Sequence, residues 1–276
     1  MKTLFITNAG GIDYMSDVIF HGGKKIHGKN FYETNKMWYM YDNLDIESKK
    51  KLYGRGFTIS GKIDHSLYNE LPGSVEELIR DKFFDKIIYG SIWRCQDYWE
   101  LVSSVYDKED IIIIDGEDDS EIIFKFVEKS TYFKRELYEN HPYVFPINFG
   151  VPEEVILSEV SEKKILTSDI IPNFSRNYLY EYESDYFRHY AECWFAITKM
   201  KGGWDCMRHY EIMMNGCIPL FENLEQCPPL TMVDLPKVEL IKFSKEKEIN
   251  LDNNKFVLDY VKNNLTTKKI FNKIIN

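Results

Sequence analysis

Residues 2–27 read KTLFITNAGGIDYMSDVIFHGGKKIH, and this stretch decides the fold. The apolar run within Lys2–Thr7 predicts a short buried strand. Gly10 and Gly11 follow it as a turn, and Asp13–His27 then has the pattern of a helix. A strand, a glycine turn and a helix in this order form the first unit of a doubly wound α/β fold.

Further apolar runs continue the alternation of strands and helices. Phe84–Tyr89 and Asp110–Ile114 are closed by polar turns, as expected for parallel strands covered on both faces. Tyr98–Tyr106 lies between them and predicts a crossover helix. The remaining predicted strands lie within Asn30–Tyr41, Leu52–Ile63, Tyr143–Pro146, Lys164–Ser168, Ala191–Thr198, Cys217–Phe221 and Leu240–Phe243, and the remaining predicted helices within Val75–Lys82, Arg176–Tyr190, Met207–Asn215 and Asn254–Ile275.

Length and composition limit the number of domains and the class of protein. A chain of 276 residues fits one large or two modest domains, and Pro146, Gly150 and Pro152 mark a boundary. We therefore expect domains at residues 1–150 and 151–276. Hydrophobic residues make up 44% of the chain and charged residues 29%, which excludes a disordered chain, a collagen and a coiled coil.

Charge, cysteines and hydropathy bear on the partners and the compartment. The net charge of −9 argues against non-specific binding of polyanions, which needs a basic field. The longest purely aliphatic run is Ile111–Ile114, far below the ~20 residues that span a bilayer, so no membrane span is expected. Five cysteines at irregular spacing predict neither a disulfide framework nor a zinc site, which favours the reducing cytoplasm.

Residues 201–221, KGGWDCMRHYEIMMNGCIPLF, carry the sharpest chemical pattern in the chain. Gly202 and Gly203 precede a helix, so the backbone can approach a ligand and direct free N–H groups at a phosphate. Arg208 can bind a diphosphate through two hydrogen bonds. Glu211 lies on the same helix face, where it can accept both hydroxyls of a ribose. The alternative is an ordinary loop followed by an i,i+3 ion pair.

Acidic residues of the first half are candidates for a general base. Asp13 follows the first glycine turn, while Glu117 and Asp118 follow a buried strand, where open α/β sheets present functional groups. Each has a simpler interpretation, because carboxylates also cap helices. The acidic turn at residues 115–119 could instead hold Mg²⁺ or be solvated.

Several other side chains have two interpretations each. Lys134 and Arg135 form either a diphosphate clamp or a solvated basic pair. Trp204 either stacks on a nucleobase or packs in the core. His21 lies on the same helix face as Asp13, and a packed or capping role is favoured over a catalytic one.

Residues 198–237 resemble the nucleotide-sugar-binding half of two-Rossmann (GT-B type) glycosyltransferases, especially the exostosin-like ones. The resemblance is carried by the acidic Glu211, by the turn Gly216–Pro219 into a strand, and by Cys227-Pro228 and Leu235-Pro236-Lys237. It implies an α/β fold of two Rossmann-like domains that face a cleft, in a compact GT-B form. Weaker likeness to small glycosyltransferase-like proteins covers residues 13–22, 54–58 and 132–136.

The resemblance also implies an activity, the transfer of a sugar from a nucleotide-diphosphate sugar to an acceptor hydroxyl. The C-terminal domain would bind the donor, with Glu211 on the ribose and Arg208 on the diphosphate. The N-terminal domain would hold the acceptor and the base. The other expected donor-binding residues are Gly202, Gly203, Trp204, Lys134, Arg135, Gly10 and Gly11.

GT-B enzymes typically neutralise the leaving diphosphate with helix dipoles and basic side chains, so the resemblance implies neither a metal ion nor a cofactor. The expected partners are the nucleotide sugar and a glycan or another hydroxyl acceptor. Two alternatives are open. One is transfer to hydroxymethylated bases of phage DNA, which the acidic net charge disfavours, and the other is a non-catalytic nucleotide- or sugar-binding protein.

Overall fold

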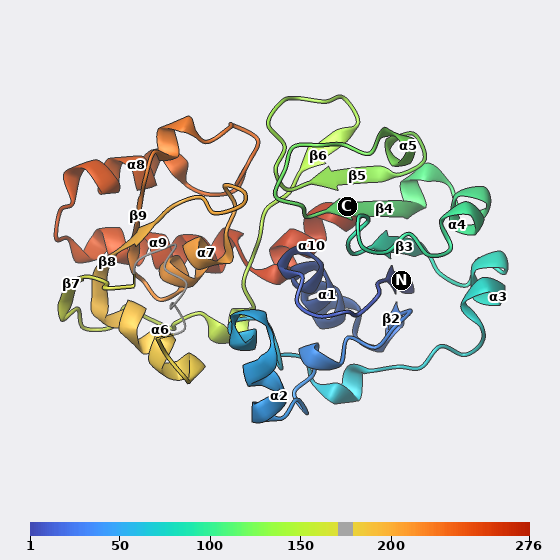
Figure 1. Cartoon of the computed structure of the whole chain (residues 1–276), viewed down its shortest axis with the longest axis horizontal. Helices are drawn as coiled ribbons and strands as arrows, with labels where there is room; N and C mark the ends of the chain where they lie inside the picture. The colour runs from blue at the N-terminus through green and yellow to red at the C-terminus, as the bar shows by residue number, and fades with distance from the viewer. Residues whose placement is uncertain (171–178) are drawn as a thin grey trace.

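Two parallel β-sheets, each flanked by helices, make up the computed structural model, which describes residues 1–170 and 179–276 (Figure 1). The α/β class predicted from the sequence is confirmed. In the described chain the larger sheet has the order β2-β1-β3-β4-β5-β6, and all neighbouring strands are parallel. Its strands are β1 (Thr3–Ile6), β2 (Phe31–Glu33), β3 (Lys86–Tyr89), β4 (Ile111–Asp115), β5 (Thr131–Lys134) and β6 (Val144–Pro146).

Helices cover both faces of this larger sheet. Phe5 and Ile88 belong to the apolar cluster that includes α1 (Tyr14–His27), whereas Leu4 and Ile87 belong to the cluster on the other face. Burial on both faces explains why the central strands are continuous apolar runs in the sequence. The further helices of this half are α2 (Ile46–Lys51), α3 (Val75–Arg80), α4 (Trp99–Val105) and α5 (Phe124–Val127).

A smaller parallel sheet follows in the second half of the chain. Gly216 turns the chain into its last strand with a φ of +61°, a left-handed conformation that glycine adopts without strain. The strands, in spatial order, are β7 (Ile165–Thr167), β8 (Cys193–Thr198) and β9 (Ile218–Phe221), and the helices are α6 (Glu183–Glu192), α7 (Met207–Met214), α8 (Lys237–Glu246) and α9 (Leu251–Asn264).

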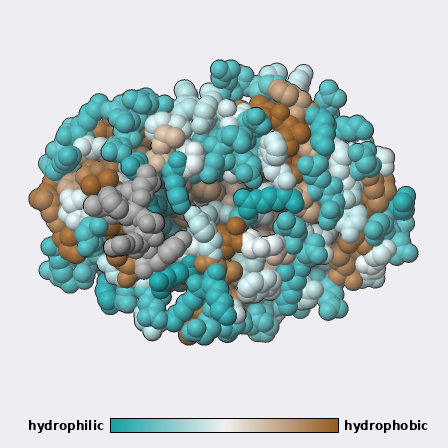
Figure 2. All heavy atoms as spheres, viewed as in Figure 1, coloured by the Kyte–Doolittle hydropathy of each residue, from teal (hydrophilic) through white to brown (hydrophobic). Residues whose placement is uncertain are grey.

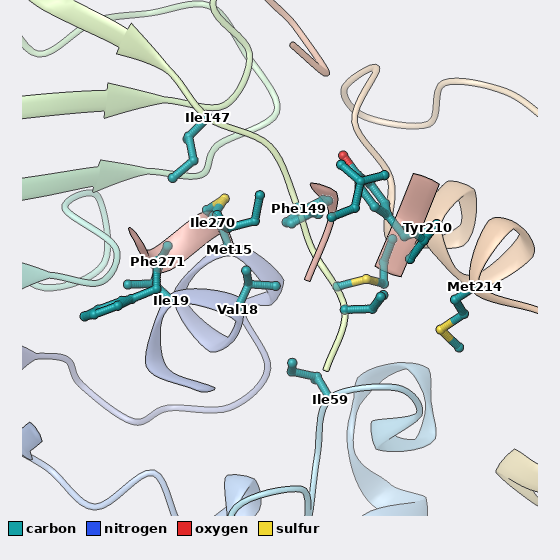
Figure 3. Packing of buried hydrophobic residues seen from close by; sticks show 14 of the residues in the cluster. Met15, Val18, Ile19, Ile59, Ile147, Phe149, Tyr210, Met214, Ile270 and Phe271 are labelled. Carbon is teal, nitrogen blue, oxygen red and sulfur yellow. The ribbon is translucent and has the colours of Figure 1, made fainter. Parts of the chain in front are cut away.

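The last helix, α10 (Thr267–Ile275), returns to the first half and packs against α1 (Figure 1). Gly22 permits this close approach, because a Cβ at that position would overlap the backbone of Thr267. Ile19 of α1 and Phe271 of α10 lie in the same apolar cluster (Figure 3). The predicted domain boundary stays a prediction, and α10 lies in space with the first half.

One apolar cluster extends from the first half of the chain into the second. It includes Met15 and Val18 of α1, Phe149 of the connecting segment, and Tyr210 and Met214 of α7 (Figure 3). The two halves therefore share buried apolar surface, which stabilises their relative position.

Three predicted elements differ from the structure. The strand predicted at Leu240–Phe243 is wrong, because these residues lie inside α8 and bury their two apolar ends on one helix face. Leu52–Ile63 was predicted to hold a loop and a strand; the loop is confirmed and the strand is wrong, since several of these residues have positive φ and form turns. The helix predicted over Asn254–Ile275 is interrupted between α9 and α10, where Thr266 caps the second helix.

Two further differences from the prediction concern the short strand β5 and the start of helix α6. Strand β5 was not predicted, because only two apolar residues, Tyr132 and Phe133, separate Thr131 from Lys134. The helix predicted over Arg176–Tyr190 begins only at Glu183 as α6, and its residues 176–178 lie outside the described part of the chain.

Most of the molecular face seen in Figure 2 is hydrophilic, and its apolar residues form separate small clusters. Among the described residues, no helix combines the length and the apolar character needed to cross a bilayer.

Candidate functional site

The loops at the carboxyl ends of the two sheets contact one another. Gly202 and Gly203, in the loop after β8, pack directly against Asp118 after β4 and Glu136 after β5. A Cβ on either glycine would overlap one of these carboxyl groups. The carboxyl ends of both sheets therefore face the same region, which is where open α/β sheets bind ligands.

A cavity of about 420 Å³ lies at the carboxyl ends of β1 and β3. The chain passes from β1 to β2 on one side and to β3 on the other, so this point is the topological switch point of the sheet. Tyr53 lies on the rim and its hydroxyl accepts a hydrogen bond from Lys201 Nζ of the second half at 2.8 Å. The other lining residues are Thr7, Asn8, Gly10, Gly11, Ile12, Asp13, Ser16, Tyr39, Lys51, Leu52, Ser91, Arg94 and Cys95.

Asp13 lies in this cavity and also caps helix α1. Its Oδ1 accepts the Ser16 N–H at 3.3 Å, and its Oδ2 lies 3.2 Å from Arg94 Nε. The capping interpretation is confirmed, and the role of Asp13 as a base stays a prediction. The carboxylate is held in place by a backbone N–H on one side and a guanidinium on the other.

Arg94 is a charged cavity residue that the sequence interpretation did not single out. Its Nε also lies 3.4 Å from Glu117 Oε1, so one guanidinium lies between two of the predicted base candidates. Its position five residues after the end of β3 was a usable signal, because polar residues at the ends of neighbouring parallel strands come together.

The acidic turn after β4 is paired with the basic residues of β5. Asp115 is fully buried and accepts hydrogen bonds from Lys134 Nζ at 2.9 Å and from the Tyr132 hydroxyl. Asp118 is 65% exposed at its side chain and pairs with Arg135. A Mg²⁺ ion in this turn would have to displace these cations.

Another group of carboxylates has metal-ligand spacing. In the described residues, the cluster of possible ligand atoms within 4.8 Å of one another is formed by Asp42, Asp64 and His65, all exposed. It lies outside the predicted site, and His65 Nδ1 already contacts Asp42 at 2.9 Å. The acidic turn does not form such a cluster.

Lys134 and Arg135 are buried, so the interpretation as a solvated basic pair is wrong. Arg135 donates to Gly116 O at 2.9 Å, to Glu136 Oε1 at 2.9 Å and to the Asp205 carbonyl. It therefore joins the ends of β4 and β5 to the loop after β8. A diphosphate could reach these cations only by replacing their present partners.

The amides after the glycine pair already bind an anion of the protein. The Glu136 carboxylate accepts the Trp204 N–H at 3.1 Å and the Asp205 N–H at 2.9 Å. His209 Nε2 donates to the Trp204 carbonyl at 2.8 Å, and burial lowers the pKa of this histidine to about 4. Trp204 is buried in the main apolar cluster, as the core interpretation predicts.

Arg208 and Glu211 lie in a second polar cluster with Tyr186 and Tyr190. Arg208 is half-buried, and among the described residues it forms no ion pair within 4.0 Å, so the predicted alternative of a pair with Glu211 is wrong. Burial alone would lower the pKa of Arg208, but the facing Tyr190, Tyr186 and Glu211 raise it. This leaves a cation without a close carboxylate partner beside the buried glutamate.

Glu211 is buried and accepts two hydroxyls of the protein. Thr58 Oγ1 donates to its Oε1 at 2.5 Å and the Tyr186 hydroxyl to its Oε2 at 2.7 Å. Burial raises the pKa of Glu211, and these two hydrogen bonds oppose the shift. One carboxylate of α7 is thus bound to residues of both halves.

Thr58 has an unusual backbone for a β-branched residue. Its φ is +73°, and the Ile59 N–H donates to the Phe57 carbonyl at 2.9 Å, which makes a strained γ-turn. The Thr58 N–H donates to Glu183 at 2.5 Å in addition to the hydroxyl bond with Glu211. Two carboxylates of the second half therefore hold this turn, which no sequence signal indicated.

The predicted site residues thus fall into three groups. Asp13, Gly10 and Gly11 line the switch-point cavity, and Glu117 is joined to them through Arg94. Gly202, Gly203, Trp204, Asp118, Lys134 and Arg135 meet where the two sheets face each other, and Arg208 and Glu211 lie in the polar cluster of α6 and α7.

No protein-family model matches the chain, and no curated protein matches it. The likeness to GT-B glycosyltransferases therefore depends on the residues given above and stays a prediction.

Proposed function

We propose that this protein transfers a sugar from a nucleotide-diphosphate sugar to an acceptor hydroxyl. The observation that supports this most is the contact between the carboxyl-end loops of two parallel sheets, with a cavity at the switch point of the larger one. Such an arrangement lets one ligand bind to each sheet and meet the other between them. We further propose the compact GT-B arrangement, with an acceptor-side domain and a donor-side domain.

The switch-point cavity is suited to an acceptor with several hydroxyl groups. Asn8, Ser16 and Ser91 offer amide and hydroxyl groups that both donate and accept hydrogen bonds. Tyr53 adds an aromatic ring at the rim, against which a sugar ring can pack. A glycan fits this lining better than an extended apolar acceptor does.

Asp13 is the base that we propose. It would accept the proton of the acceptor hydroxyl as that oxygen forms a bond to the anomeric carbon. The bond between this carbon and the donor diphosphate breaks, and its electron pair leaves on the diphosphate oxygen. Glu117 is the second candidate, because it shares Arg94 with Asp13.

The donor side is proposed to use Arg208 and Glu211. Arg208 has no close carboxylate partner among the described residues, so its guanidinium can bind two diphosphate oxygens. The first turn of α7 adds the partial positive charge of a helix N-terminus. These groups would neutralise the leaving diphosphate, and we propose that the step requires no metal ion or cofactor.

A donor panel followed by product detection tests the proposal. Thermal shifts with UDP-, GDP-, CMP- and dTDP-sugars would identify the donor, because a ligand at 100 Kd adds ~2.7 kcal/mol to the native state. Mass spectrometry with glycan acceptors, and with hydroxymethylated DNA as the alternative acceptor, would then detect transfer. A shift without any transfer or donor hydrolysis would indicate the non-catalytic binding protein instead.

A further inference from the structure

Asp17 lies on the first turn of α1, directly behind the wall of the switch-point cavity. Its side chain is completely buried. The Tyr39 hydroxyl lies 2.8 Å from its Oδ1, and the Asp13 N–H donates to its Oδ2 at 3.2 Å. Tyr39 also lies 2.8 Å from the Gly11 carbonyl. Asp17 therefore contacts the backbone of the cavity loop directly at the Asp13 N–H, and through the Tyr39 hydroxyl at the Gly11 carbonyl.

The hydrogen atoms in this chain of contacts can be counted. The Tyr39 hydroxyl carries one hydrogen, and the Gly11 carbonyl can only accept. If Asp17 were ionised, Tyr39 would have two acceptors within 2.8 Å and could serve only one of them. If Asp17 is protonated, it donates to Tyr39, Tyr39 donates to Gly11, and the second Asp17 oxygen accepts the Asp13 N–H. Only the protonated form satisfies every contact.

The charges around Asp17 lead to the same protonation state. Across residues 1–170 and 179–276, no basic nitrogen lies within 4.0 Å of its carboxyl group. The charged groups that face it are Asp13, which repels a second negative charge, and the more distant Arg94. Burial, followed by the repulsion from Asp13, raises the pKa of Asp17 well above its ordinary value. A buried carboxylate without a cation becomes neutral by binding a proton.

We infer that Asp17 is held as a neutral carboxylic acid and acts as a positioning residue, which fixes the Gly11–Asp13 loop through Tyr39 and the Asp13 amide. The positioning role of Asp17 in catalysis rests on the proposed function, whereas the protonation of Asp17 does not. This arrangement gives two nearby carboxyl groups different partners, since Asp13 pairs with Arg94 while Asp17 keeps a proton.

Asp17→Asn is the matched variant, because its amide can donate to Tyr39 and accept from Asp13 as the protonated acid does. The wild-type acid gains its proton from the folded environment, so its stability relative to Asp17→Asn should decrease as pH rises above the ordinary carboxyl range. Thermal melts from pH 4 to 8 on both proteins would show this as a melting temperature of Asp17→Asn that rises relative to that of the wild type as pH increases. A constant difference, or failure of Asp17→Asn to fold, would overturn the inference.

The protonation state can also be observed directly. Carboxyl ¹³C spectra of the whole labelled wild-type protein, assigned through the backbone, should show Asp17 in its protonated form at pH 7. An ionised Asp17 at pH 7 would refute the proposal without reference to any activity. If Asp17 is protonated and no transfer occurs, the proposed function fails and the protonation stands.

The positioning role is tested with two variants once transfer is measured. Asp17→Ala should lower kcat by about 10²-fold, the size expected when a reacting group is misplaced by about 1 Å. Asp17→Asn should rescue most of this loss. Equal loss in both variants, or no loss in Asp17→Ala, would contradict a positioning role.

Discussion

Replacing Arg135 by methionine should destabilise the protein by about 3–5 kcal/mol, the range for breaking a buried ion pair. Arg135 is 1% exposed at its side chain and is bonded to Glu136, Asp118 and the Asp205 backbone. Asp118 is mostly exposed, so its pair with Arg135 contributes little. Most of the loss comes from Glu136, which is fully buried and would either stay charged without a cation or have to bind a proton.

The pH dependence of this variant follows from Asp205. Burial raises the pKa of Asp205 to about 7, and Arg135 opposes that shift. A carboxyl group whose folded pKa lies above its unfolded value loses stability as pH rises toward the folded pKa. Removing Arg135 raises the folded pKa further, so Arg135→Met should be more destabilising at pH 8 than at pH 6.

Urea unfolding followed by circular dichroism at both pH values measures these effects. Arg188→Met is the control, since Arg188 is 68% exposed at its side chain and pairs with Asp185 on α6, where less than ~1 kcal/mol is expected. Adding Glu136→Gln to Arg135→Met should recover part of the loss, because it removes the carboxylate that has no cation, while one of the Trp204 and Asp205 N–H groups loses its acceptor. If Arg135→Met is no less stable than the control, Arg135 does not join the two halves in the way described.

Arg208→Ala and Glu211→Ala should each weaken binding of the donor, by ~1.5–3 kcal/mol for a lost hydrogen bond to a charged group, which calorimetry would measure. Unchanged affinity in both folded variants would exclude the donor site. Transfer should survive excess EDTA, and a strict Mg²⁺ or Mn²⁺ requirement would shift Glu117 and Asp118 from base candidates to metal ligands. Asp13→Asn should keep donor binding and lose 10²–10⁴-fold in turnover, roughly the effect of removing a general base, whereas near-normal turnover would leave Asp13 as a helix cap only.

Much of the sheet core could be predicted from the sequence because local physics decides it. Strands β1, β3 and β4 are buried on both faces, so each is a continuous apolar run that ends in a polar turn. Gly216 marked the turn from α7 into β9, and it does have the left-handed φ that this turn requires. The position of Gly10 and Gly11 at the cavity follows from the same logic, since the turn after β1 lies at the switch point.

The rest could not be predicted because long-range contacts decide it. Nothing local distinguishes α10, which packs on α1 across more than 240 residues of sequence, as the His21–Thr267 contact shows. The partner of Arg135 in the second half is the backbone carbonyl of Asp205. Because every residue has a backbone carbonyl, no sequence pattern can indicate this partner. The strained turn at Thr58 depends on two glutamates more than 120 residues away.

The groups predicted to bind the donor already have partners within the protein in this structure, and the donor contacts themselves stay a prediction. Glu211 was expected to accept two ribose hydroxyls, and it accepts the hydroxyls of Thr58 and Tyr186. The amides after Gly203 were expected to bind a phosphate, and they bind the Glu136 carboxylate.

A ribose diol could replace the two hydroxyls on Glu211 without changing the number of hydrogen bonds to the carboxylate. Release of Thr58 would also relieve a backbone strain of order 1–3 kcal/mol. No such exchange is available at Glu136, because a phosphate there would leave a fully buried carboxylate beside a second anion. If a nucleotide sugar binds, its ribose should therefore reach Glu211, and its diphosphate should contact Arg208 while the amides after Gly203 stay bound to Glu136.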